Sequence, residues 1–384
     1  MTTQSLVFDA VEEPDPGLKW QARWQRSWPA YRAWFIGRGG ENGPSLQECE
    51  AAMARCMPEL VPVHRRLTQL AGGGELEARF LSTWCPPAYL GGCSIAALAA
   101  GKDVRLVRNY DLSPDLNEGL LLRTEWTGLP VMGMIEFLWG LSDGINAAGL
   151  SVALAFGGSK RIARGFGVTT ILRYVLETCG TVAQGLKILR SVPSHMAYNV
   201  TLADRHGASA TAELLPGGGA RILQPAIATN HQHGSVAADR PGFTRTHERR
   251  DHLERLLASG IAPDALGEAF LVSPLFQKNY NEGFGTLFTA VYDPASCGLT
   301  LRWPGQDWHQ TLDSFAEGRR EVNYRGGHQG WEDFRQLPAA DPVAALAAVR
   351  PYLSPAAGRA FDHWAAKSRV GEPDWADFGR IFWR

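Results

Sequence analysis

The residues best suited to chemistry are gathered around one cysteine, Cys93, which directly follows Gly91 and Gly92. A short alternating run after Cys93, a glycine turn at 101–102 and a second run ending at 108–111 predict a β-hairpin. Folding the chain about that turn puts Cys93 opposite Tyr110 and makes Arg108 its diagonal neighbour. A cation and a carboxylate, Asp111, close to one cysteine favour a nucleophilic thiol.

The place of Asp111 in this group depends on the end of the second strand. Strict alternation would turn Asp111 to the face opposite Arg108. We therefore expect the strand to end or bulge at Asp111.

The composition excludes several classes of function. The formal net charge is −1 and 45% of the residues are hydrophobic, so neither a nucleic acid nor an anionic membrane surface is an expected partner. No secretory signal and no apolar run long enough for a membrane span are visible. The six cysteines are scattered, which is typical of reduced thiols and predicts a cytoplasmic protein.

The expected secondary structure around Cys93 changes at that residue from helices to strands. Residues 18–84 predict helices, with a tryptophan stripe that Pro29 should kink or interrupt. Strands are expected after Cys93, then two helices, then strands again, which predicts an α+β protein with packed sheets and outer helices. The expected strands are 119–124, 131–138, 151–156, 198–203, 210–215, 221–229, 286–292 and 298–303; the expected helices are 169–179, 181–189, 245–257 and a tail from 341.

Six motifs then occur in a specific order: Gly92-Cys93-Ser94, Arg108-Asn109-Tyr110-Asp111, 143–150, Leu202-Ala203-Asp204 with Gly207 and Glu213, Ala228-Thr229-Asn230-His231, and Thr286-Leu287-Phe288 with Asp293-Pro294. This series, within about 45–305, resembles the acyl-CoA:6-aminopenicillanic-acid acyltransferase family. That family belongs to the N-terminal-nucleophile hydrolases and is related to choloylglycine hydrolases and penicillin V acylases.

The resemblance implies an αββα sandwich of two antiparallel sheets and a precursor cut between Gly92 and Cys93. The chemistry agrees with such a cut: Gly91 and Gly92 allow the backbone conformation that a thiol attack on the preceding carbonyl requires. An α-amino group titrates near pH 8 and a thiol near about 8.5, so an N-terminal cysteine can supply both base and nucleophile. Together with the helical patterns at both ends, we expect a helical segment 1–92, a catalytic domain 93–320 and a helical tail 321–384, which the resemblance does not cover. We expect residues 1–92 to stay bound after the cut, because their tryptophan-rich face would otherwise be exposed apolar surface.

The resemblance also implies roles for individual residues. Cys93 is the nucleophile, Arg108 steadies its thiolate, and Asp111 holds the freed amino group. Asn230 points its side-chain NH2 at the tetrahedral oxyanion, and a backbone N–H near Phe156 completes that hole. Two further positions concern the substrate. Tyr110 stands where the family usually has tryptophan, and a downstream arginine completes the site, for which Arg249 and Arg250 are both candidates.

Two other clusters carry weaker signals. His231 and His233 alternate on an expected strand and could face one metal, but ordinary polar histidines are the simpler interpretation. Lys160, Arg161 and Arg164 precede Gly165-Phe166-Gly167 and a helix start. Such a loop is either a dock for the phosphates of coenzyme A or, more simply, a solvated basic surface. No metal and no resident cofactor is therefore expected, with coenzyme A a candidate co-substrate.

The sequence thus predicts a self-processing enzyme that cleaves a linear amide, or transfers its acyl group, through a thioester on Cys93. Its partner would be a small-molecule acyl amide. Two alternatives stay open: a choloylglycine-hydrolase-like or penicillin-acylase-like enzyme with water as its acceptor, and an unprocessed binding protein that keeps the fold.

Overall fold

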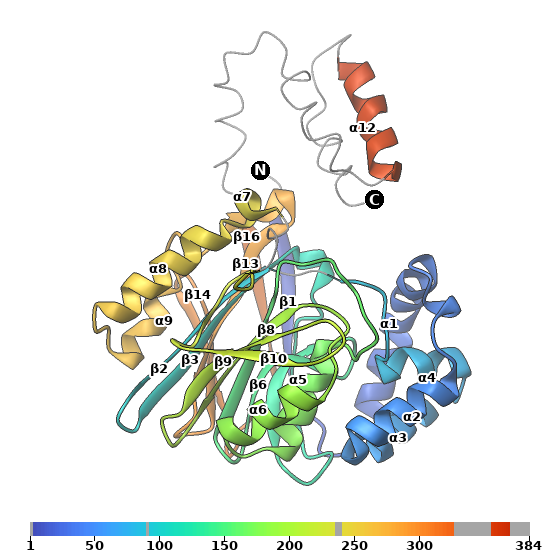
Figure 1. Ribbon diagram of the computed structural model, residues 1–384, viewed down its shortest axis with the longest axis horizontal. Helices are drawn as coiled ribbons and strands as arrows, with labels where there is room; N and C mark the ends of the chain where they lie inside the picture. Colours follow the sequence, from blue (N-terminus) through green and yellow to red (C-terminus); the bar gives the residue numbers. More distant parts are fainter. Residues whose placement is uncertain (1–2, 90–91, 235–239, 326–354, 369–384) are drawn as a thin grey trace.

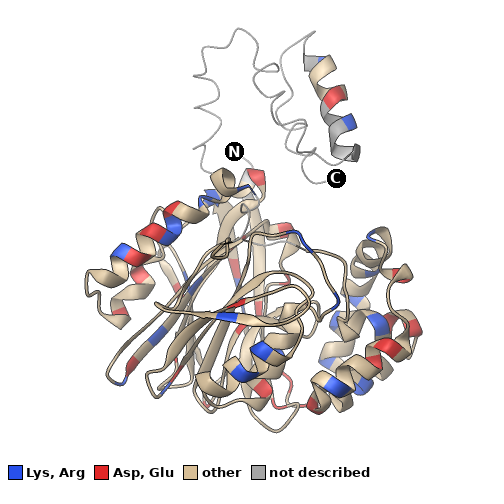
Figure 2. Ribbon diagram, viewed as in Figure 1, with Lys and Arg blue, Asp and Glu red and all other residues tan. Residues whose placement is uncertain are grey.

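The computed structural model describes residues 3–89, 92–234, 240–325 and 355–368. Two β-sheets are stacked on each other, and helices cover the outer face of each (Figure 1). Charged residues of both signs are interspersed along the outer helices, while the strands carry fewer of them (Figure 2).

The first sheet has nine strands in the order β10-β9-β8-β7-β6-β5-β4-β1-β16. Its pairs are antiparallel except β1 with β4, which run parallel. The bounds are β1 (Thr3–Glu12), β4 (Leu120–Thr124), β5 (Val131–Glu136), β6 (Gly140–Asn146), β7 (Leu150–Phe156), β8 (Tyr198–Asp204), β9 (Ser209–Leu214), β10 (Ala220–Leu223) and β16 (Gly318–Arg325).

The second sheet has seven strands in the order β11-β2-β3-β13-β14-β15, with β12 paired to β13. All of its pairs are antiparallel. The bounds are β2 (Gly92–Ala100), β3 (Asp103–Leu112), β11 (Ile227–Ala228), β12 (Lys278–Asn279), β13 (Phe284–Asp293), β14 (Gly298–Trp303) and β15 (Gln306–Thr311).

The helices form separate groups. Helices α1 (Leu18–Gly37), α2 (Leu46–Cys56), α3 (Val61–Leu70) and α4 (Glu75–Ser82) precede Cys93. Helices α5 (Val168–Thr178) and α6 (Val182–Ser191) lie on the nine-stranded sheet, and α7 (Pro241–Thr244), α8 (Thr246–Ala258) and α9 (Leu266–Ala269) lie by the other sheet (Figure 1). The last described helix is α12 (Pro355–Ser368). Within the described residues, no helix combines the length and apolar character that a bilayer crossing requires.

The four layers of secondary structure, helices, two sheets and helices, pack together through three apolar clusters. Val152 and Leu154 of β7 point to the layer under α1–α6, whereas Ala153 and Ala155 between them point to the layer between the sheets. The third layer packs β2 and β3 against Leu253 of α8 and neighbouring residues. Because every second residue of a strand faces the same side, β7 buries both faces. The architecture is αββα, and the predicted fold class is confirmed.

Several element predictions need correction. Residues 1–92 are not wholly helical, since β1 lies inside the nine-stranded sheet. Helix α1 continues through Pro29, which lies on its exposed side. The single strand expected at 221–229 is two strands, β10 and β11, in different sheets. Strand β16 crosses the predicted domain boundary at residue 320, and most of the expected tail lies outside the described residues.

Candidate active site

Cys93 is the second residue of β2 and is 1% exposed. The register pairs Cys93 with Tyr110 and Ile95 with Arg108, so the predicted hairpin and its diagonal neighbour are confirmed. Arg108 Nη2 lies 3.1 Å from Cys93 Sγ and donates a hydrogen bond to it. The thiol and the guanidinium thus share the space between the two sheets.

Arg108 is held by an aspartate, a serine and an aromatic ring. Its Nη1 forms a fully buried ion pair with Asp143 Oδ2 and donates to Ser142 Oγ at 3.0 Å. Its Cζ lies 4.3 Å from the centre of the Tyr110 ring. Burial alone would lower the pKa of Arg108, but Cys93 and Asp143 raise it overall. The guanidinium is therefore a fixed positive charge beside the sulfur.

A second carboxyl group reaches the same space from β5. The Tyr110 hydroxyl donates to Glu136 Oε1. Burial raises the pKa of Glu136 to about 7, although the Tyr110 hydrogen bond and Arg108 oppose that shift. Glu136 is thus a titratable group in direct contact with Tyr110, the residue that pairs with Cys93.

The prediction that the second strand ends or bulges at Asp111 is wrong. Strand β3 continues to Leu112, and Asp111 pairs with Gly92 without a shift of register. The irregularity lies instead on β13, between Thr286 and Phe288. Asp111 consequently turns to the α8 side of the sheet, where Thr286 Oγ1 donates to it at 2.7 Å. Burial raises the pKa of Asp111, opposed by Arg249 and Thr286.

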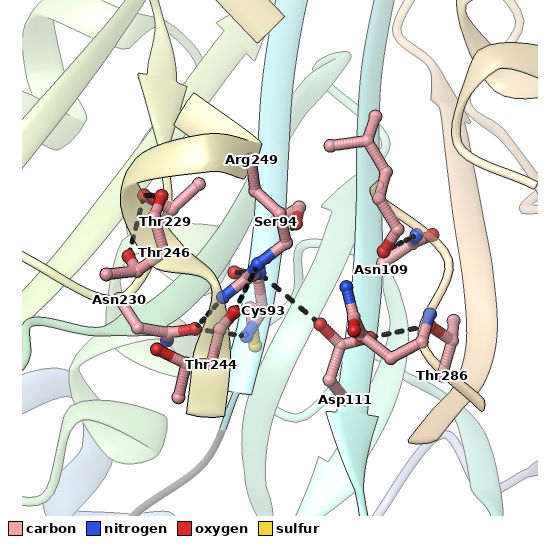
Figure 3. Close-up of polar contacts among 12 residues, drawn as sticks. Cys93, Ser94, Asn109, Asp111, Thr229, Asn230, Thr244, Thr246, Arg249 and Thr286 are labelled. Carbon is pink, nitrogen blue, oxygen red and sulfur yellow. Dashed lines mark hydrogen bonds and ion pairs between the residues drawn. The ribbon is translucent and has the colours of Figure 1, made fainter. Parts of the chain in front are cut away.

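Arg249 of α8 connects that face to the backbone of Cys93 (Figure 3). Its Nη1 donates to the Cys93 carbonyl at 2.6 Å and to Ser94 Oγ at 2.7 Å, and it lies 3.4 Å from Asp111 Oδ2. Arg250 instead pairs with Glu254 at 2.9 Å, away from the site. Of the two arginines, the structure therefore places Arg249 beside Cys93.

Asn230 contacts the peptide nitrogen of Cys93. Its Oδ1 accepts from that N–H at 3.1 Å and from Arg249 Nη2 at 2.7 Å. Its Nδ2 donates to the Phe156 carbonyl at 3.2 Å. Phe156 thus contacts Asn230 through its carbonyl oxygen, whereas its backbone N–H was expected to contribute to the site. The side-chain NH2 of Asn230 is thus engaged with that carbonyl.

The Cys93 thiol is buried, which disfavours its thiolate form. Burial raises its pKa to about 11, with Arg108 opposing the shift and Asp111 adding to it. The preceding position has room for glycine alone, because a Cβ on Gly92 would lie 2.1 Å from the Phe284 ring.

The side chains of the histidine pair and of the basic loop contact separate protein partners. His231 Nδ1 lies 2.8 Å from Thr246 Oγ1, while His233 Nδ1 lies 2.8 Å from Glu213 Oε1. Among the described residues, no three His, Cys, Asp or Glu side chains are arranged to hold a metal. In the basic loop, Arg164 forms an exposed ion pair with Glu48 at 2.8 Å.

A family model described as acyl-coenzyme A:6-aminopenicillanic acid acyl-transferase matches residues 99–308, more than half of the chain. The chain belongs to this acyltransferase family. The match contains Arg108, Asp111, Asn230 and Arg249, and it begins six residues after Cys93. No curated protein sequence matches the chain significantly.

Three solved structures resemble this family member. Penicillin V acylase from Agrobacterium tumefaciens is 14% identical with a TM-score of 0.41, over 59% of this chain and 90% of that chain. A mutant conjugated bile acid hydrolase from Clostridium perfringens is 13% identical with a TM-score of 0.40, over 62% and 100%. A Caenorhabditis elegans N-acylethanolamine-hydrolyzing acid amidase ortholog is 14% identical with a TM-score of 0.42, over 60% and 99%.

The sequence motifs assign no role to several residues of the candidate site. Asp143, Ser94 and Thr286 lie in motifs that carried the resemblance, but nothing in their spacing points to Arg108, Arg249 or Asp111. Glu136 had a usable signal, because it is an acidic residue within the apolar run 131–138. An ionisable side chain in such a run needs a partner, and here that partner is Tyr110.

Proposed function

We propose that this acyltransferase-family member cleaves its own chain between Gly92 and Cys93 and then uses Cys93 as an N-terminal nucleophile on a linear acyl amide. The observation that carries the proposal is the contact of Asn230 and Arg249 with the backbone of Cys93 itself. Side chains that hold the N–H and C=O of one residue fix the position of its peptide bond. Arg108 holds the sulfur of the same residue.

Self-cleavage begins when Cys93 Sγ attacks the Gly92 carbonyl. The C–N bond breaks, the nitrogen takes up the thiol proton, and a thioester joins Gly92 to Cys93. Water then hydrolyses this thioester, which leaves a carboxylate on Gly92 and a free α-amino group on Cys93. The new amine supplies the base that a thiol with a pKa of about 11 needs.

In turnover the α-amino group of Cys93 takes the thiol proton, and the thiolate attacks the substrate carbonyl. The Asn230 NH2 exchanges the Phe156 carbonyl for the developing oxyanion and stabilises it. The leaving amine departs with the proton held by the α-ammonium group, and an acyl thioester stays on Cys93. Arg249 and Asp111 keep the amino end in place.

Water is the default acceptor for this thioester, and an amine or coenzyme A is the alternative. The chemistry at Cys93 is the same for each, because only an occupied acceptor site excludes water. The basic loop is the candidate dock for coenzyme A, and Arg164 would have to leave Glu48 to serve it.

The test is to incubate the processed protein with a panel of acyl amides and to add an amine or coenzyme A in increasing amounts. A transient mass gain of one acyl group on the 93–384 piece, together with release of amine, would support the proposal. Cys93→Ala should show neither signal. Free acid as the main product at every acceptor concentration indicates hydrolysis, and ping-pong kinetics with acylated acceptor indicate transfer.

A further inference from the structure

The segment that carries Asn230 leaves the seven-stranded sheet just before that residue. Strand β11 ends at Ala228, and residues 229–233 follow it outside the strand. Thr229 is fully buried and Asn230 is 1% exposed. Because buried backbone carbonyls need hydrogen-bond donors, the position of Asn230 depends on the side chains that supply those donors.

Asn199 of β8 supplies two of these donors. Its Nδ2 donates to the Thr229 carbonyl at 2.8 Å and to the His231 carbonyl at 2.9 Å, so it holds the backbone on both sides of Asn230. Asn199 is 2% exposed. Within the described residues its Oδ1 has no hydrogen-bond partner, so the polar contacts of this side chain are those of its NH2. Since β8 belongs to the nine-stranded sheet, Asn199 ties the segment to the sheet opposite Cys93.

The neighbouring strand anchors the other end of the same segment. Glu213 of β9 pairs with Asn199 across the ladder and is 1% exposed. Its Oε1 accepts from the backbone N–H of His233 at 2.8 Å. Between these anchors, Gln232 Nε2 donates to one backbone carbonyl of β8 and one of β9, at 3.2 and 3.0 Å. The segment is thus fixed to two strands along residues 229–233.

These anchors hold the backbone around Asn230, whereas the proposed reaction changes the contacts of its side chain. Asn230 Oδ1 accepts from the Cys93 N–H, which the cut converts into an amino group. Asn230 Nδ2 donates to the Phe156 carbonyl, which the oxyanion would replace. A donor stabilises an oxyanion only when it already lies at hydrogen-bond distance from it. The backbone anchors are the contacts that can keep Asn230 in place while its side chain changes partners.

We infer, on the basis of the proposed function, that Asn199 is a positioning residue that holds Asn230 in place for the oxyanion, and that Glu213 anchors the same segment at its other end. Asn199 acts through Asn230 and takes no part in the bond changes at Cys93. Glu213 belongs to the motifs that carry the family resemblance, and its contact with His233 gives it a role there.

Kinetics of the processed protein test the role of Asn199. Asn199→Ala should lower kcat by about 10- to 100-fold with little change in KM, because a small displacement of a catalytic group costs on that order. Asn199→Asp keeps the size of the side chain without its N–H groups and should be at least as slow. Asn199→Ala combined with Asn230→Ala should have the kcat of Asn230→Ala alone, because the two residues act as one unit. A normal kcat in Asn199→Ala, or a full further loss in the double variant, would overturn the inference.

Asn146→Ala is the matched control for a general loss of stability. Asn146 is also fully buried, and its Nδ2 also donates to two backbone carbonyls, those of Leu176 and Cys179, at 2.7 Å each. Its removal should lower Tm at least as much as the removal of Asn199 but leave kcat within about twofold of wild type. An equal fall of kcat in both variants would overturn the inference.

Glu213 is tested by a conservative and a disruptive substitution. Glu213→Gln keeps an oxygen that can accept from the His233 N–H, and it should retain most of the wild-type kcat. Glu213→Ala removes the acceptor and should lower kcat by about tenfold, as expected for the loss of one buried anchor. Equal values of kcat in Glu213→Gln and Glu213→Ala would overturn the anchoring role.

Hydrogen exchange tests the anchors without any catalysis. In uncleaved Cys93→Ala protein, adding Asn199→Ala should speed exchange of the amides in residues 229–233 by about tenfold, because two hydrogen bonds that oppose local opening are lost. Adding Asn146→Ala instead should leave these amides unchanged. Unchanged exchange in the Asn199 variant would overturn the inference. Faster exchange in a protein whose wild type neither cuts itself nor turns over an amide would keep the anchors and reject the proposed function.

Discussion

At the scale of single residues, the site divides between the two faces of β2 and β3. Cys93, Arg108 and Tyr110 project into the space between the sheets, while Ser94 and Asp111 project toward α8. Alternation along a strand produces this division. The backbone of Cys93 lies between the two groups, so one residue connects a charged cluster on each side.

The first residue-scale prediction concerns Asn230. In processed protein, Asn230→Ala should lower kcat by about 100- to 1000-fold with little change in KM, because the lost donor acts mainly in the transition state. Rates should be normalised to the fraction with a free Cys93 N-terminus, since self-cleavage slows as well. Asn117→Ala is the control, because Asn117 only caps a turn at Gly119. A near-normal kcat would exclude the oxyanion role.

A second prediction at this scale concerns Glu136 and pH. The folded-state pKa is raised from 4.5 to about 7, so its stabilising contribution is complete below pH 4.5 and is lost as the pH rises through 7. In uncleaved Cys93→Ala protein, Glu136→Gln should remove about 2 kcal/mol of the fall in unfolding free energy between pH 5 and pH 8. Urea titrations at both values measure this. Exposed Glu50→Gln should change nothing, and an unaltered slope in Glu136→Gln would contradict the prediction.

At the scale of elements, β1 explains why the residues before Cys93 belong to the folded unit. It pairs with β4 on one side and β16 on the other, so it completes the nine-stranded sheet from within. Phe8 of β1 is fully buried, and its ring centre lies 5.1 Å from that of Trp303 in the other sheet. Removing β1 would expose two strand edges and an apolar face.

Substitution of Phe8 tests this role of β1. Phe8→Ala should cost about 3–5 kcal/mol of unfolding free energy, because it leaves a cavity between the sheets. In processed protein it should also release the N-terminal piece at a lower urea concentration, as size-exclusion chromatography would detect. Val7→Ala, on the exposed side of the same strand, should change stability by less than about 0.5 kcal/mol. Equal effects of the two changes would place β1 outside the core.

The elements differ in how far the sequence predicts them. The hairpin around Cys93 and the helices α5, α6 and α8 have strong local patterns, and the structure has them close to the expected places. Strand β1 has no such signal, because its sheet partners β4 and β16 lie more than a hundred residues away. The pairing of Arg108 with Asp143 likewise depends on the stacking of the two sheets. Local periodicity carries no information on either contact.

At the scale of the whole molecule, we propose a chain that is cut in two and remains one folded body. The N-terminal piece would supply β1 and the aromatic helix α1. Stacked tryptophans of α1, with Trp24 and Trp28 at 4.5 Å, pack with Phe80 against the rest of the protein. We expect these contacts to hold the pieces together after the cut.

The mass of the purified protein tests the central claim most directly. Wild type should give two pieces, 1–92 and 93–384, that co-elute under native conditions and separate in denaturant. Cys93→Ala should give a single intact chain. A wild type that stays in one piece while cleaving amides at full rate would contradict the account, as would a cut at any bond other than Gly92–Cys93.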